Sequence, residues 1–122
     1  MKIAASGVTT RATTALTVTL SRDATMTTVG LAGELDLAGE SAVAEVAAQL
    51  RRTGCREVDL DVTRLRFCDA RGLGAILALR RGMDDAGVRV TLRGANRAMV
   101  RLLRLTGLEY LLDSDEDLAV AQ

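Results

Sequence analysis

The stretch from residue 58 to residue 79 constrains the fold of this chain more than any other. It reads VDLDVTRLRFCDARGLGAILAL. Its beginning alternates apolar and polar residues, as a half-buried strand does, whereas its end repeats apolar residues at helical spacing. We therefore expect a strand, a short connector to Phe67 and Cys68, a turn at Asp69, and a helix from Ala70. The most exposed chemistry of the fold is expected at that turn.

The rest of the chain divides into short elements separated by glycine and polar turns. Alternating apolar residues predict strands at about 16–20, 26–31, 57–61 and 88–92, with a short edge strand at 110–112. Helical spacing predicts helices at about 40–52, 70–86 and 95–106. Ser114 and the acids that follow it suit the start of a last helix. The first two strands are close enough to form a hairpin.

This order of elements predicts an α/β fold. The expected sheet is small and mixed, with four to five strands, and carries about four helices mostly on one face. We expect residues 1–15 to be a loose N-terminal tail and residues 16–122 to be a single domain, since no proline, linker or repeat interrupts them.

Charge and residue types exclude several functions. Sixteen basic residues balance sixteen acidic ones, which argues against a general binder of nucleic acid or anionic membrane. There is no His, and only Cys55 and Cys68, so we expect no metal site, no cofactor and no His-assisted nucleophile. No apolar run approaches the ~20 residues that span a bilayer. We expect a cytoplasmic protein with reduced cysteines and no membrane insertion.

Three motifs follow one another along the chain. Residues 33–38 read GELDLA, residues 69–73 read DARGL, and residues 102–108 read LLRLTGL. In sequence and spacing they resemble the STAS domain of bacterial anti-sigma factor antagonists, whose motif at the second place is Asp-Ser-Ser/Thr-Gly-Leu. The resemblance covers about residues 15 to 120 and implies the STAS fold.

The resemblance implies a binding protein without catalytic residues. In this family the loop after the second strand and the start of the helix after the Asp-Ser motif together dock an anti-sigma factor, often a Ser/Thr kinase of the histidine-kinase-like ATPase type. Docking releases a sigma factor for transcription. By position, the partner-binding residues would be Asp36, Asp69, Ala70, Arg71, Gly72 and Leu73. Both aspartates also suit helix capping, because a carboxylate accepts hydrogen bonds from free backbone N–H groups.

Two residues depart from the family motif. Ala70 occupies the place of the phosphoacceptor serine and has no oxygen to modify, so the usual phosphorylation switch is not expected. Arg71 replaces a small polar residue, and a cation in a first helical turn opposes the helix dipole by ~0.3 to 1 kcal/mol. We expect it to pair with Asp69 or Asp36, or with a carboxylate of a changed partner.

Other functions remain open at this point. A STAS-type structural subunit of a signalling scaffold or lipid-transport ATPase complex needs no phosphoacceptor, and an exposed apolar strip near Leu79 and Met83 would favour it. An enzyme that uses Asp36 and Asp69 as acid and base lacks a nucleophile, metal set or cofactor fingerprint. Direct nucleic-acid binding by the predicted arginine face of the third helix lacks aromatic stacking residues.

Overall fold

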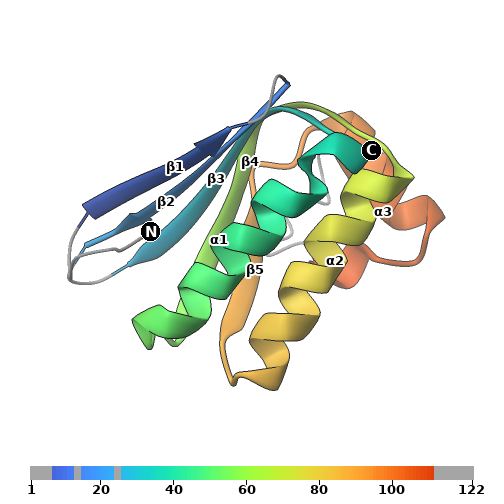
Figure 1. Ribbon diagram of the computed structural model, residues 1–122. Coiled ribbons are helices and arrows are strands. Elements are labelled where there is room, and N and C mark those ends of the chain that lie inside the picture. The colour runs from blue at the N-terminus through green and yellow to red at the C-terminus, as the bar shows by residue number, and fades with distance from the viewer. Residues whose placement is uncertain (1–6, 13–14, 24–25, 112–122) are drawn as a thin grey trace.

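The computed structural model describes residues 7–12, 15–23 and 26–111. They form a mixed five-stranded sheet whose strands lie in the order β1-β2-β3-β4-β5 (Figure 1). The antiparallel strands are β1 (Gly7–Ala12), β2 (Leu16–Arg22) and β3 (Thr27–Leu35). The parallel part continues from β3 through β4 (Glu57–Cys68) to β5 (Arg89–Arg93). The predicted α/β class, mixed sheet and hairpin are confirmed.

Helices provide the crossovers between the parallel strands. The helix α1 (Glu40–Thr53) leads from β3 to β4, and α2 (Ala70–Asp85) leads from β4 to β5. They lie side by side over one face of the sheet (Figure 1). After β5 comes α3 (Arg97–Leu105), and two short 3-10 helices, η1 (Leu37–Gly39) and η2 (Glu109–Leu111), complete the described elements. None of the described helices is both long and apolar enough to cross a membrane.

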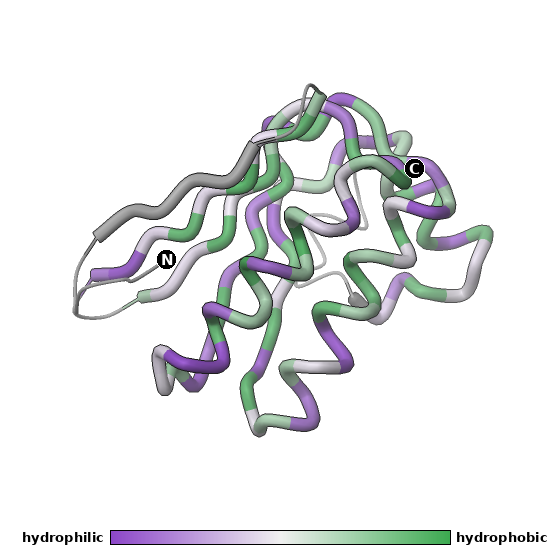
Figure 2. The backbone as a smooth tube through the Cα atoms, viewed as in Figure 1, coloured by the Kyte–Doolittle hydropathy of each residue, from purple (hydrophilic) through white to green (hydrophobic). Residues whose placement is uncertain are grey.

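The alternation of apolar and polar residues gives the sheet two different faces. Val58, Leu60 and Val62 of β4 are each 1% exposed and point to the helices, whereas Asp59 and Asp61 between them lie on the other face. Figure 2 shows the alternation as successive apolar and polar bands along the strands. The core is therefore an aliphatic layer between the sheet and its helices.

Three local predictions differ from the structure. The loose tail predicted for residues 1–15 is wrong at Gly7–Ala12, which pair with β2 as a full strand. The connector predicted after residue 61 is wrong, because β4 continues to Cys68, with register shifts against β3 that absorb the irregular part. The edge strand predicted at 110–112 is wrong as far as it is described, since Glu109–Leu111 form η2. The helix predicted from Ser114 lies outside the described residues.

Candidate functional site

The two predicted site segments meet at the carboxyl ends of neighbouring parallel strands. Leu35 at the end of β3 and Cys68 at the end of β4 are register partners. Asp36 and Asp69, the next residues, therefore begin adjacent connections at the same edge of the sheet. This edge is where ligand and partner sites of parallel sheets commonly lie.

Both aspartates cap the helices that follow them. Asp69 has extended backbone, and its carboxylate accepts a hydrogen bond of 2.8 Å from the backbone N–H of Gly72. Asp36 likewise accepts a hydrogen bond of 3.0 Å from the N–H of Ala38 and so begins η1. The interpretation of these residues as caps is confirmed. Because both carboxylates are used in this way, they fix the positions of the two helix starts.

A glycine allows α2 to begin against the end of β3. The N–H of Asp69 donates to the carbonyl oxygen of Leu35 at 3.3 Å. A Cβ at Gly72 would lie 2.2 Å from that same oxygen, so only glycine permits this approach. Gly72 is buried and Leu73 is 3% exposed. These two residues shape the site from below, and exposed neighbours form its surface.

The surface of the site consists of small, apolar and basic side chains. Ala70 and Arg71 are exposed in the first turn of α2. Leu37, which follows β3, is 54% exposed, and Phe67, near the end of β4, is 49% exposed. We define Leu37, Phe67, Ala70 and Arg71, with the capping residues Asp36 and Asp69, as the docking surface.

Arg71 does not form the local pair that its sequence position suggested. It makes no ion pair with Asp69, Asp36 or any other residue in the part of the chain that the structure describes. Its charge therefore stays in the first turn of α2, where the helix dipole disfavours a cation. A carboxylate from outside would relieve this opposition.

Sequence reasoning missed the exposed apolar residues Leu37 and Phe67. Leu37 stands in a predicted loop next to a capping aspartate, which was a usable signal of exposure. Phe67 gave no such signal, because the strand alternation before it is reset by the register shifts between β3 and β4.

Cys68, beside Asp69, is not suited to nucleophilic chemistry. Burial, together with the neighbouring Asp69 charge, raises the pKa of its thiol to about 11, so the thiol stays protonated at neutral pH. Among the described residues no group of His, Cys, Asp or Glu side chains could hold a metal ion. Cys68 is therefore not a candidate nucleophile at this site.

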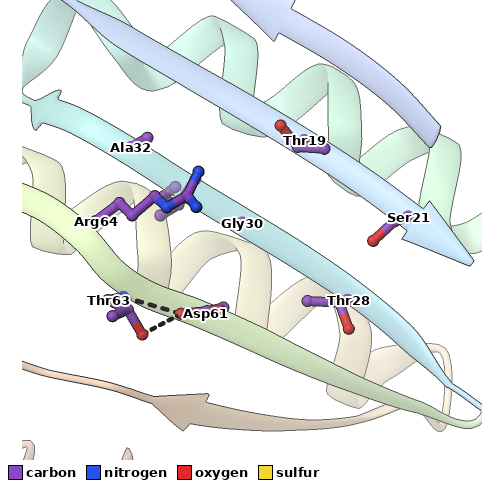
Figure 3. A pocket seen from close by; sticks show the side chains of 9 residues that line it. Thr19, Ser21, Thr28, Gly30, Ala32, Asp61, Thr63 and Arg64 are labelled. Carbon is purple, nitrogen blue, oxygen red and sulfur yellow. Dashed lines mark hydrogen bonds between the residues drawn. The ribbon is translucent and has the colours of Figure 1, made fainter.

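The open face of the sheet carries a separate polar network. The hydroxyl of Thr63 donates to Asp61 at 2.5 Å and its N–H at 2.9 Å, beside a shallow hollow that Arg64 overhangs (Figure 3). Arg93 of β5 reaches the Asp61 carboxylate at 3.5 Å. Burial alone raises the pKa of Asp61, but the Thr63 hydrogen bonds and the nearby arginines outweigh it and hold the pKa below its usual value. This network joins β4 to β5 and lies apart from the docking surface.

Comparison with known proteins identifies the family. The model of the family described as "Mlab, STAS domain" matches residues 16–113. The chain belongs to the STAS domain family. The anti-sigma-B factor antagonist of Staphylococcus aureus is 25% identical over 88 residues, which are 72% of this chain and 82% of that protein.

Solved structures agree with the STAS fold. An anti-sigma factor antagonist from Mycobacterium paratuberculosis superimposes with a TM-score of 0.63 and 19% identity, covering 94% of both chains. The unphosphorylated anti-sigma factor antagonist SpoIIAA gives 0.61 and 21%, covering 84% of this chain and 92% of that one. A crystal structure of Mglu gives 0.58 and 29% over 64% of this chain, which spans only 19% of that protein. The predicted family and fold are confirmed.

Proposed function

We propose that this STAS protein is an anti-sigma factor antagonist that binds an anti-sigma factor through the docking surface. The supporting observation is that two segments far apart in sequence bring exposed Leu37, Ala70 and Arg71 to one edge of the sheet, on rigidly capped helix starts. The S. aureus relative is named for this function, and the match covers 82% of its length. Binding would release a sigma factor.

The partner that fits this surface is a protein of the histidine-kinase-like ATPase type. An apolar contact at Leu37 and Phe67 would supply buried area, since each side chain is about half exposed in the free chain. A partner carboxylate would pair with Arg71, which forms no ion pair with another described residue. Arg71 would then mark a changed partner preference within the family.

The proposed complex is not reversed by phosphorylation at residue 70. SpoIIAA exists in phosphorylated and unphosphorylated forms. At Ala70 this chain has a methyl group at the exposed start of α2, which cannot accept a phosphoryl group. A kinase-like partner would therefore stay bound in the presence of ATP.

The structural-subunit alternative lacks the observation that would favour it. Leu79 is 2% exposed and Met83 is fully buried, so these residues of α2 do not form the exposed apolar strip that would favour this alternative. Both side chains belong to the core beneath the helix. We therefore keep this alternative only as an outcome of the test.

The test is an affinity capture from the lysate of the native cell with three versions of the tagged protein. Leu37→Asp places a charge on the docking surface, and Leu105→Asp places the same charge at an 80% exposed residue at the end of α3. We expect the native and Leu105→Asp proteins to retain a histidine-kinase-like ATPase and Leu37→Asp to lose it. Retention of transporter or scaffold subunits, or of the same proteins by all three versions, would contradict the proposal.

The contribution of Arg71 is tested in the same complex. Arg71→Ser removes the first-turn cation, and Arg81→Ser removes an exposed arginine further along the same helix. We expect about tenfold weaker binding for Arg71→Ser only, as for loss of one charged contact worth ~1.4 kcal/mol. Equal affinities of both variants would contradict a role for Arg71 in partner choice.

A further inference from the structure

A small hollow lies beside the docking surface, where β4 extends beyond its neighbour β5. The register of β5 against β4 ends at the pair Asp61 and Arg93, whereas β4 continues to Cys68. Beyond that pair the start of α3 lies along β4, because the side-chain amide of Asn96, its N-cap, donates to the carbonyl oxygen of Leu65 at 3.2 Å. The hollow between these two segments has a volume of about 150 Å³.

The described lining of the hollow is mainly apolar. Leu65 and Met99 are buried, at 4% exposure each, whereas Phe67 and Ala98 are exposed. Small-molecule pockets usually measure about 300 to 1,000 Å³, so this hollow is too small to enclose such a ligand. Its size suits one apolar side chain of a protein partner, and such an anchor commonly dominates the binding energy of an interface.

The side of the hollow that faces α3 is positively charged. Arg66 lines the hollow, and Arg97 and Arg101 are exposed one turn apart on α3. None of the three forms an ion pair with another residue that the structure describes. Glu34, the register partner of Phe67, belongs to β3, which borders the opposite edge of β4. Carboxylates beside the apolar side chain of an occupant would match the charge on the α3 side.

Two helix starts at this edge of the sheet carry a cation. Arg97 is the first residue of α3, and Arg71 is the second residue of α2. The helix dipole disfavours positive charge at both places, and a nearby carboxylate would offset this effect. An acidic partner therefore fits this edge better than a neutral or basic one.

We propose that the hollow receives one apolar side chain of the anti-sigma factor, from a segment whose carboxylates pair with Arg66, Arg97 and Arg101. This inference rests on the proposed function, because the occupant is the partner that contacts the docking surface. Phe67 belongs to both the docking surface and the hollow, so one continuous contact covers the two. The apolar side chain anchors the complex, and the arginines select an acidic partner and speed its association.

Filling the hollow tests the anchor. Ala98→Trp places an indole ring at the hollow from an exposed position of α3, and Leu105→Trp places the same ring at the other end of that helix. The probe is the purified histidine-kinase-like ATPase that the native protein retains in the capture experiment, and the affinity is measured by calorimetry. We expect about thirtyfold weaker binding for Ala98→Trp, as for loss of one anchor side chain, and native affinity for Leu105→Trp.

Alkylation of Cys68 locates the contact in the native chain. Cys68 lines the hollow, whereas Cys55 lies just before the opposite end of β4 and serves as an internal control. Modification of each thiol by iodoacetamide is followed by peptide mass spectrometry at one fixed alkaline pH, with and without the ATPase. A saturating amount of the ATPase should slow modification of Cys68 about tenfold, because the rate follows the fraction of molecules with an open hollow. The rate of Cys55 should not change.

Removal of the two arginines on α3 tests the acidic character of the partner. Combined Arg97→Ser and Arg101→Ser should weaken binding about tenfold and make it less sensitive to NaCl. Combined Arg51→Ser and Arg81→Ser, which removes exposed arginines of α1 and α2, should change neither quantity.

The outcomes separate this inference from the proposed function. Where the ATPase binds the native protein but not Leu37→Asp, the proposed function stands. Native affinity of Ala98→Trp, or an unprotected Cys68 in that complex, would then overturn the hollow as an anchor. Native affinity of the variant without Arg97 and Arg101 would overturn the acidic partner segment. An ATPase that does not bind the native protein would overturn both the proposed function and this inference.

Discussion

Replacing Gly72 by Ala is expected to destabilise the fold, although alanine is the better helix former. The new Cβ would lie 2.2 Å from the backbone oxygen and 2.8 Å from the carbonyl carbon of Leu35. Because the obstacle is backbone, α2 would have to move away from β3. Overpacking lowers the free energy of unfolding by about 1 to 3 kcal/mol, and the higher helix propensity of alanine offsets about 1 kcal/mol of this loss. With a rigid obstacle the cost lies at the upper end, so we expect the free energy of unfolding to fall by about 2 kcal/mol.

Gly74 provides a matched control in the same helix. A Cβ there would meet no atom within 4 Å, so Gly74→Ala should raise the free energy of unfolding by up to about 1 kcal/mol. Urea unfolding followed by far-UV circular dichroism gives both values, and thermal unfolding should place the midpoint of Gly72→Ala about 8 °C below that of the native protein. A Gly72→Ala protein as stable as the native one, or a rise of stability in both variants, would refute the close approach of α2 to β3.

Three further substitutions test the caps, the open-face network and a glycine contact. Asp69→Ala should lower the free energy of unfolding by about 1 kcal/mol in urea titrations, whereas Asp69→Asn should keep most of it; equal losses would contradict the cap. Asp61→Asn should destabilise by about 1 kcal/mol at pH 7. Because the folded pKa of Asp61 is depressed, this difference is fully present above pH ~4 to 5 and should shrink as the pH falls through the folded pKa; a difference independent of pH would contradict the assignment. Gly94→Ala should destabilise the protein more than Gly87→Ala. Both glycines have positive φ, but only at Gly94 would a Cβ meet the side chain of Thr63. Equal midpoints of the two variants in thermal unfolding would contradict that contact.

The main elements of the fold could be predicted because local signals agree with the tertiary structure. Alternation in β2 and in the first half of β4 places every second residue in the core, and Gly54 ends α1 with a left-handed backbone at φ 71°. β1 was missed because its sequence, GVTTRA, has little apolar character, and pairing with β2 makes it a strand. The end of β4 was missed for a related reason, since its register shifts against β3 break the period of two.

The position of the candidate site could be predicted better than its surface. Asp36 and Asp69 follow neighbouring strands and cap the next helices, as their residue type and place in the sequence suggested. Arg71 forms no ion pair with Asp69, Asp36 or another residue that the structure describes, and this depends on side-chain geometry that spacing does not determine. The burial of Met83 likewise depends on how α2 packs on the sheet, and helical periodicity alone leaves that orientation open.

The most direct test of the central claim is binding of the purified protein to the histidine-kinase-like ATPase recovered with it, measured by calorimetry with and without Mg·ATP. We expect a one-to-one complex whose affinity is unchanged by ATP, with no phosphate added to the native chain. An Ala70→Ser variant should bind equally at first and then, with ATP, gain the mass of one phosphate group and dissociate. Failure of the native chain to bind, or its release and phosphorylation by ATP, would contradict an anti-sigma factor antagonist that lacks the serine switch.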